Sequence, residues 1–149
     1  MPLRPIRHRR VRRTDFAAVQ ALLAGLHGAA DGGERAVRSR FRRLVADLGA
    51  DIYLATVDEA VCGLVHITYA RHLLGPARAT LELLVVAPDA RRRGVGRALL
   101  ACAGSRAHRR GCHALVSRGV PDDARGFFAR IGWRAAGTQL QFDLPAGAD

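Results

Sequence analysis

The segment from Leu81 to Leu100, LELLVVAPDARRRGVGRALL, constrains the fold more than any other part of the chain. Its continuous apolar run Leu83–Val86 predicts a strand covered on both faces. Pro88 and Asp89 end that strand, and a helix is expected to begin at Gly94. The segment therefore predicts a buried strand, a short loop and a helix.

The start of this helix predicts an anion site. Gly94 and Gly96 remove side chains there, so a ligand can approach the backbone closely. The first N–H groups of a helix have no internal partner, and the helix dipole adds positive charge at the same end. A phosphate group fits such a place. Full positive charges are added around it by Arg91, Arg92, Arg93 and Arg97.

Two other glycine-rich phosphate loops do not fit the segment. A P-loop ends in Gly-Lys-Ser/Thr, and the chain contains no lysine. A dinucleotide-binding fingerprint needs a third glycine and a place after the first strand, and both are missing.

The length and hydropathy of the chain predict one domain over residues 1–149. No apolar run approaches the ~18 residues of a membrane span. The arginine-rich N-terminus has no apolar stretch after it, unlike a secretory signal. A cytoplasmic protein without a membrane partner is expected.

The formal net charge is +11, and all the basic residues other than histidine are arginine. This charge is typical of partners such as nucleic acid or acidic membranes. Compositional bias explains it as well, because the arginines are spread over the chain apart from the cluster Arg7–Arg13. We therefore expect no specific nucleic-acid partner, while the charge would steer a polyanionic cofactor.

The cysteines and histidines predict no metal site. Cys62, Cys102 and Cys112 show no C-x-x-C spacing, and the six histidines are scattered. The odd number of cysteines indicates reduced thiols.

Hydrophobic periodicity predicts alternating strands and helices over the chain. The expected strands are Ile6–Val11, Asp51–Val57, Ala60–Ala70, Ala79–Val86, His113–Ser117 and Leu140–Leu144. The expected helices run from Thr14 or Asp15 to Gly28, from Arg35 to Leu48, from Gly94 to Arg110, and from Pro121 to Gly132. Gly63, inside a strand, predicts a close backbone contact or a bulge, and Arg71–Arg78 is expected to form a loop.

Two motifs and the order of these elements resemble the GNAT N-acetyltransferases. Arg91-x-x-Gly94-x-Gly96 is similar to the family's pyrophosphate motif, Gln/Arg-x-x-Gly-x-Gly/Ala after a strand. Ala124-x-x-Phe127-Phe128-x-x-x-Gly132-Trp133 is similar to its Ala-x-x-Phe-Tyr-x-x-x-Gly-Phe. The Arg-His-Leu-Leu-Gly run before the central strand is similar to the small-amine, aminoalkylphosphonate-type branch.

The resemblance implies an α/β (α+β) fold and a cofactor. The GNAT fold has a mixed central sheet of six to seven strands, four flanking helices, and a splay between the fourth and fifth strands. The co-substrate would be acetyl-coenzyme A. Its pantetheine would run along Leu84, Val85 and Val86 like an added strand. The remaining contacts would come from Arg91, Arg92, Arg93, Gly94, Val95, Gly96, Arg97 and Phe128.

The same resemblance implies the catalytic roles. Glu82 would be the general base, since an acceptor amine must lose a proton before attack. The alternative for this acid in an apolar strand is a structural ion pair with an arginine. The backbone N–H of Val86 would be the oxyanion donor.

The general acid is the departure from the family pattern. Many members carry Tyr where this chain has Phe128, and often Asn where it has Pro121. The residues that could replace the acid are Tyr69, His66, Ser117 and His113, of which we place Tyr69 first. A protein that binds acetyl-coenzyme A with little turnover stays open as well.

The expected reaction is acetyl transfer to a primary amine of a small molecule, by direct attack in a ternary complex. The alternatives are a protein N-terminal or lysine acetyltransferase, and an acyl-coenzyme A sensor. Asp31 and Glu34, in the loop between the first two helices, could hold an ammonium group. The sequence leaves open the acceptor, the use of other acyl groups and a homodimer.

Overall fold

The computed structural model describes residues 4–26, 32–118, 120–137, 140–141 and 143. The chain forms two compact units, Met1–Gly119 and Val120–Asp149, and each is described by itself. The expectation of one domain stays a prediction.

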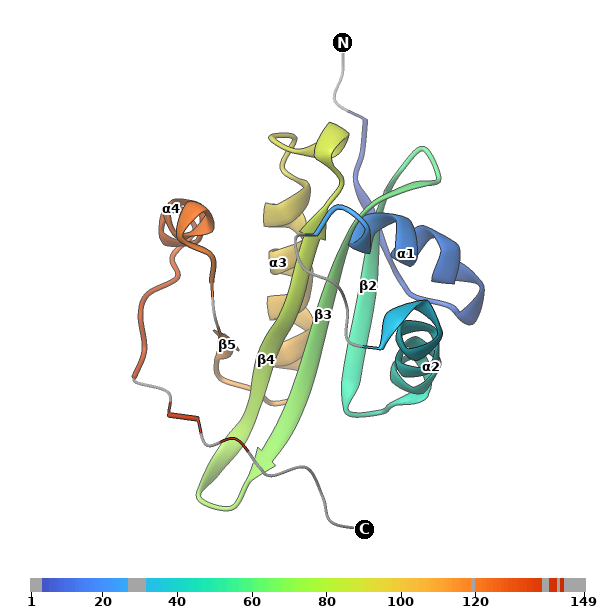
Figure 1. The fold of residues 1–149 in the computed structure, drawn as a ribbon. Helices are drawn as coiled ribbons and strands as arrows, with labels where there is room; N and C mark the ends of the chain where they lie inside the picture. The colour runs from blue at the N-terminus through green and yellow to red at the C-terminus, as the bar shows by residue number, and fades with distance from the viewer. Residues whose placement is uncertain (1–3, 27–31, 119, 138–139, 142, 144–149) are drawn as a thin grey trace. The chain divides into compact units, whose positions relative to one another are not determined.

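The first unit is built on a five-stranded sheet in the order β1-β2-β3-β4-β5 (Figure 1). Its strands are β1 (Arg7–Arg10), β2 (Ala50–Val57), β3 (Ala60–His72), β4 (Gly75–Val86) and β5 (Leu115–Ser117). The first four strands pair antiparallel, and β5 pairs parallel to β4. The sheet is therefore mixed, as expected for a strand that returns after a helix.

Helices cover both faces of this sheet (Figure 1). The helices α1 (Phe16–Leu23) and α2 (Gly33–Ala46) lie on one face, and α3 (Val95–Arg109) lies on the other. Short 3-10 turns, η1 (Arg13–Asp15) and η2 (Pro88–Ala90), precede α1 and follow β4. No helix within the described ranges is long and apolar enough to cross a membrane.

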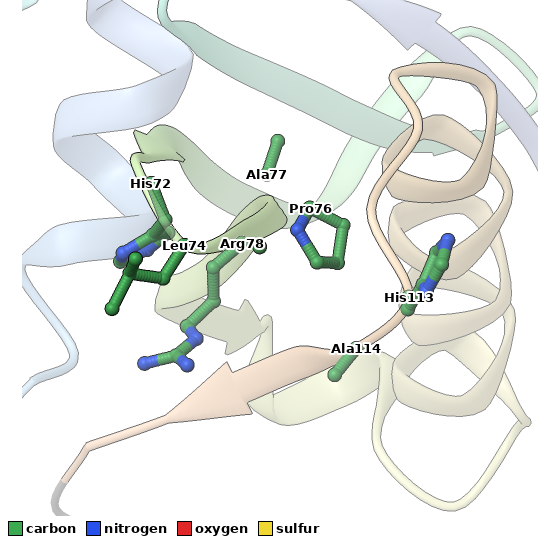
Figure 2. A pocket seen from close by; sticks show the side chains of 8 residues that line it. His72, Leu74, Pro76, Ala77, Arg78, His113 and Ala114 are labelled. Carbon is green, nitrogen blue, oxygen red and sulfur yellow. The ribbon is translucent and has the colours of Figure 1, made fainter.

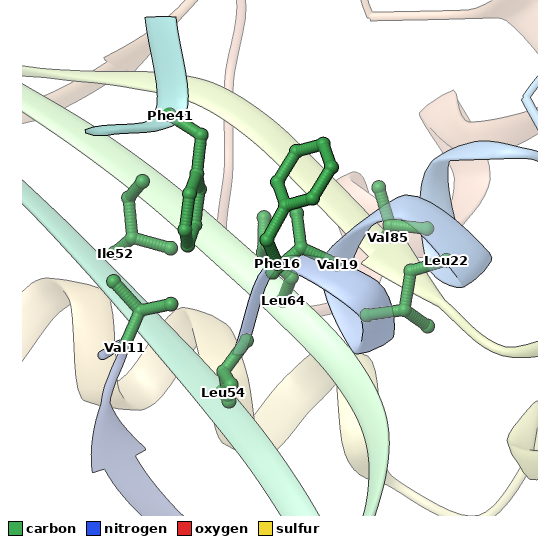
Figure 3. Packing of buried hydrophobic residues seen from close by; sticks show 9 residues of the cluster. All are labelled: Val11, Phe16, Val19, Leu22, Phe41, Ile52, Leu54, Leu64 and Val85. Carbon is green, nitrogen blue, oxygen red and sulfur yellow. The ribbon is translucent and has the colours of Figure 1, made fainter. Parts of the chain in front are cut away.

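The core between α1, α2 and the sheet is an apolar cluster (Figure 3). Phe16 of α1 and Phe41 of α2 pack with ring centroids 5.4 Å apart. The other members are Val11, Val19, Leu22, Ile52, Leu54, Leu64 and Val85. Apolar side chains at helical spacing on α1 and α2 meet alternate residues of β2 and β3 there.

Gly63 of β3 lies against α3 on the opposite face. A Cβ atom placed there would lie 2.9 Å from Leu99 Cδ1 and 3.0 Å from Val95 Cγ1. The β2–β3 register also shifts beside it, between Ala55 and Thr56. The structure thus confirms both the close contact and the bulge that the glycine predicts.

Asp51 of β2 is a buried carboxylate that contacts residues of β1, β3 and α3. Its side chain is fully buried and accepts hydrogen bonds from Arg10 Nη1 at 2.8 Å and from Tyr69 Oη at 2.7 Å. Arg106 of α3 and Arg110, which directly follows α3, add ion pairs at 3.4 and 3.5 Å. A buried charge needs such partners, because an unpaired one is costly.

Two expectations about strands differ from the structure. The loop predicted over Arg71–Arg78 is wrong: β3 continues to His72, and β4 already begins at Gly75. Cross-strand pairs such as Ala70↔Arg78 and His72↔Gly75 extend the hairpin to its end, so tertiary pairing overrides the local turn signal of Gly75-Pro76.

The expected sheet of six to seven strands has five strands in the described structure. Of the last expected strand, Leu140–Leu144, the described residues Leu140, Gln141 and Asp143 are not in a strand. Phe142 and Leu144 lie outside the described residues.

The second unit contains α4 (Arg125–Arg130), preceded by the 3-10 turn η3 (Asp122–Ala124). Phe128 is buried between Phe127 and Trp133, with ring centroids 5.4 and 5.0 Å away in edge-to-face geometry. The backbone N–H of Trp133 donates a hydrogen bond to the Phe128 carbonyl at 3.0 Å, just after the end of the helix. With α4, the described residues hold the four expected α-helices.

Candidate functional site

The second half of β4 has an open edge. Strand β5 pairs with β4 only from Ala79 to Leu81, whereas β3 pairs with β4 as far as Val86. Among the described strands, only β3 therefore pairs with the segment Glu82–Val86. This is the splay between the fourth and fifth strands that the resemblance implies.

Backbone groups of this segment point into the open edge. The Ala87 N–H donates to the Cys62 carbonyl of the neighbouring β3 segment at 2.9 Å. Since N–H groups of successive strand residues point to opposite edges, those of Val86 and Leu84 face away from β3. An extended ligand can pair with them as an added strand would.

The loop that follows β4 gathers backbone N–H groups. Arg92 and Gly94 have positive φ angles of 61° and 81°, and Gly94 directly precedes the first residue of α3. Such alternation of backbone conformation before a helix forms a concave cradle for anions. An added Cβ at Gly94 would meet nothing within 4 Å, so the backbone conformation, rather than space, requires the glycine there.

The side chains around this loop are positively charged and exposed. They belong to Arg91, Arg92, Arg93 and Arg97. Within the described residues, no carboxylate forms an ion pair with any of the four. The loop thus joins free backbone donors to unneutralised charge, which suits a polyanion such as a pyrophosphate.

Glu82 occupies a β-bulge at the start of the open edge. The β3–β4 register passes from Ile67↔Leu81 to His66↔Leu83, which leaves Glu82 without a partner on β3. Its carboxylate is exposed and accepts a hydrogen bond from Thr68 Oγ1 at 2.5 Å. β-Bulges next to functional sites often change the direction of a side chain in this way.

The alternative expectation for Glu82, an ion pair with an arginine, is not what the structure shows. Within the described ranges, its carboxylate forms no ion pair with an arginine and accepts a hydrogen bond from the Thr68 hydroxyl. The role of Glu82 as a base stays a prediction, and its accessible carboxylate is compatible with it.

His66 lies on the same face of β3 as Thr68, since the two are separated by one residue. Burial lowers its pKa below the ordinary value of 6.5, and the nearby carboxylates of Glu82 and Asp47 oppose that shift. Its Nε2 atom is buried and has no hydrogen-bond partner in the described structure. A neutral imidazole with an unused nitrogen therefore lies near Glu82.

Tyr69 is the first residue proposed above for the missing acid, and it faces the other side of β3. Burial, followed by its hydrogen bond to Asp51, raises the pKa of Tyr69 far above the ordinary value of 10.0. Arg110 lies over its ring at 4.2 Å. The acid role of Tyr69 stays a prediction, and this geometry does not favour it.

The structure describes three other expected site residues. Ser117 pairs with Leu81, and this is the last residue pair between β4 and β5. His113 lines a pocket at the other end of β4. Phe128 belongs to the second unit, and its contact with a cofactor stays a prediction.

The loop between α1 and α2 lies partly outside the described residues. Asp31 is not described, and Glu34 pairs with Arg38 one helical turn away at 3.4 Å. The ammonium-binding role expected of these two carboxylates stays a prediction. No group of three metal-ligating side chains that could hold an ion occurs among the described residues.

Sequence reasoning missed Thr68. A threonine in an alternating strand carries no functional signal by itself, and its contact with Glu82 depends on the register across the bulge.

Comparison with known proteins agrees with this geometry. The family model described as "Acetyltransferase (GNAT) domain" matches residues 49–135, which include β2 to α4. No curated protein matches the sequence.

Solved structures share the fold over nearly the whole chain. A transcriptional regulator from Bacillus halodurans C-125 superposes with a TM-score of 0.81 at 23% identity, covering 94% of this chain and 100% of that one. The aminoglycoside 6'-N-acetyltransferase AAC(6')-Ih from Acinetobacter baumannii gives 0.80 at 17% identity, with 96% and 100% covered. A ribosomal-protein-alanine N-acetyltransferase from Brucella melitensis biovar Abortus 2308 gives 0.76 at 21%, with 95% and 100% covered.

Proposed function

Because the chain belongs to the GNAT acetyltransferase family, we propose that it transfers the acetyl group of acetyl-coenzyme A to a primary amine of a small molecule, within a ternary complex. The observation that carries this function is the open edge of β4, which leads directly into the anion-binding loop before α3. Glu82 lies at the start of that edge.

The described residues fit the co-substrate. The backbone N–H groups and arginine side chains of Arg91–Arg97 would hold its pyrophosphate, and the N–H groups of Leu84 and Val86 would pair with its pantetheine. When bound, acetyl-coenzyme A supplies an acetyl thioester. The N–H of Val86 points to the open edge and can donate to an oxygen that gains negative charge there.

Glu82 would accept the proton that an ammonium group must lose before it can attack. The Thr68 hydroxyl occupies one carboxylate oxygen, Oε1, and holds the side chain in one orientation. The second oxygen is left for the amine or for a bridging water.

No acid is needed for the leaving group if the thiolate is released directly. Phe128 carries no proton to donate, and a thiol with a pKa near ~8.5 departs tolerably without help. We infer slower turnover than with a tyrosine at this position, since general acid catalysis typically contributes ~10²–10⁴-fold.

A second candidate function is acetylation of protein N-termini. The fold is shared with an aminoglycoside acetyltransferase and with a ribosomal-protein-alanine acetyltransferase alike. The net charge of +11 disfavours polycationic acceptors such as polyamines or aminoglycosides. Cytoplasmic location stays a prediction, and the oligomeric state stays open.

Titration calorimetry with coenzyme A tests the binding site. Gly96→Asp should abolish binding, since it adds bulk and negative charge beside the phosphates. Gly104→Asp makes the same change farther along α3, where an added Cβ meets nothing within 4 Å, and should bind like the wild type. Absence of wild-type binding at millimolar coenzyme A would overturn the proposed function.

A screen of amines and N-terminal peptides for thiol release from acetyl-coenzyme A identifies the acceptor class. With an acceptor found, Glu82→Gln should lower kcat by ~10²-fold or more. Its coenzyme A affinity should stay at the wild-type value, because the cofactor contacts are elsewhere. Full activity of Glu82→Gln would instead make the carboxylate structural.

A further inference from the structure

A pocket of about 300 Å³ lies at the turn between β3 and β4, at the end of β4 away from the open edge (Figure 2). It is lined by the end of β3, the first residues of β4, and the segment before β5. Ligand pockets in proteins span roughly 300–1,000 Å³, so this one suits a small molecule.

The polar side chains of this pocket are all basic. Figure 2 shows Arg78 and His72 on the hairpin and His113 on the segment before β5. The guanidinium is always charged, and each imidazole has at least one N–H donor in either protonation state. No lining residue is acidic, and no described carboxylate pairs with Arg78. The pocket therefore offers unneutralised positive charge and donors from two separate segments.

The rest of the lining is apolar. It consists of Leu74, Pro76, Ala77 and Ala114, together with Gly75. Leu74 is 98% exposed. Covering such a side chain is favourable, because apolar surface is then removed from water. An inorganic ion would leave this part of the pocket unused.

We propose that this pocket binds a small carboxylate with a compact apolar body, such as an aromatic or branched-chain acid. The carboxylate accepts two parallel hydrogen bonds from the Arg78 guanidinium, a geometry that arginine favours. The apolar body lies against Leu74 and Pro76, and an imidazole N–H reaches the carboxylate from His72 or His113.

This site is separate from the acetyl-transfer site. Between them, Ala79–Leu81 of β4 pair with β5 and close that part of the strand edge. Coenzyme A binding should therefore neither require nor displace the carboxylate, and the proposal stands apart from the proposed function.

Nuclear magnetic resonance of the full-length ¹⁵N-labelled chain tests the site with benzoate as the probe. Benzoate should shift the backbone amide signals of Leu74, Ala77 and Ala114 with millimolar affinity, and saturating coenzyme A should leave this affinity unchanged. Benzamide has the same apolar body without the charge and should bind at least about tenfold more weakly, because a hydrogen bond to a charged group is the stronger kind.

Arg78→Gln should weaken benzoate binding at least about tenfold, since it removes the charged guanidinium group and its two parallel N–H donors. Arg71→Gln is the matched control: it removes the same charge from the same hairpin, outside the pocket lining, and should leave binding unchanged. If Arg78→Gln disturbs the whole spectrum, the double variant His72→Gln/His113→Gln replaces it and should weaken binding too, because it removes both imidazole donors.

Three results would overturn the proposal. They are the absence of shifts at these amides, equal affinities for benzoate and benzamide, and equal effects of Arg78→Gln and Arg71→Gln. Displacement of benzoate by coenzyme A would place the anion at the transfer site instead.

Discussion

Replacement of Gly63 by alanine tests how tightly α3 is seated on the sheet. The new Cβ would lie 2.9 Å from Leu99 Cδ1, 3.0 Å from Val95 Cγ1 and 3.1 Å from the Val85 carbonyl oxygen. Leu99 and Val95 are themselves buried, at 0% and 2% exposure, so neither side chain has free space to move into. The Val85 oxygen belongs to the backbone of β4 and cannot rotate away.

The expected cost is that of an overpacked core, about 1–3 kcal/mol. For a chain of this size, each kcal/mol corresponds to roughly 2–4 °C in the melting temperature. Circular dichroism during thermal unfolding measures this loss directly.

Gly63→Ala should also weaken coenzyme A binding. Val95 is the first residue of α3 and follows Gly94 of the loop that we propose to bind the pyrophosphate. A shift of the first helical turn by a few tenths of an ångström therefore displaces the backbone donors of that loop. Calorimetry should show a raised Kd beside the lowered melting temperature.

Gly104→Ala is the matched control within α3. An added Cβ there meets nothing within 4 Å, so alanine should stabilise the helix by roughly 0.5–1 kcal/mol, the difference in helix propensity. Replacement of glycine by alanine should thus lower the free energy of unfolding at position 63 and raise it at position 104. A Gly63→Ala protein as stable as the wild type, with unchanged coenzyme A affinity, would refute the close packing of α3 on β3.

Three further predictions follow from the charged groups. Asp51→Ala should lower the free energy of unfolding, measured with denaturant, by about 1–3 kcal/mol, because it removes the acceptor of the part-buried Tyr69 hydroxyl and the partner of the surrounding arginines. Asp15 has a pKa lowered by its hydrogen bond from Arg9; the stability difference between wild type and Asp15→Asn should be full above pH 3.8 and disappear as the pH falls through the folded-state pKa. In imidazole NMR titrations, His66 should titrate below 6.5, and Glu82→Gln should lower its pKa further, since the carboxylate opposes the effect of burial.

The sequence predicted the elements around the anion site because strong local signals mark them. Pro88 and Asp89 end the apolar strand, and Gly94 adopts the left-handed conformation that precedes α3. The hairpin end was not predictable in the same way. Gly75-Pro76 is a turn signal, and only pairing with β3 makes these residues part of β4.

The candidate site was predicted in part for a similar reason. Glu82 stands out as an acid in an apolar strand, and the structure exposes it beside the open edge. The contact with Thr68 and the unused nitrogen of His66 depend on register and burial, which one sequence does not determine. The buried network around Asp51, which holds Tyr69, depends on three separate strands and a helix.

The bulge at Glu82 connects the core of the first unit with its candidate chemistry. Before the bulge, Leu81 lies opposite Ile67, on the α3 face of the sheet; after it, Val85 lies opposite Leu64, in the cluster below α1 and α2. Because side chains alternate along a strand, Leu83 and Val85 reach the α1–α2 core only because one residue after Leu81 is left out of the pairing with β3. That extra residue is Glu82, so deleting it places Leu83 directly after Leu81 and opposite His66 in a regular ladder, and Leu83 and Val85 keep their places in the core. The deletion variant and Glu82→Gln should therefore both show a cooperative thermal transition by circular dichroism. Loss of that transition in the deletion variant alone would show that the first unit needs the bulge in order to fold.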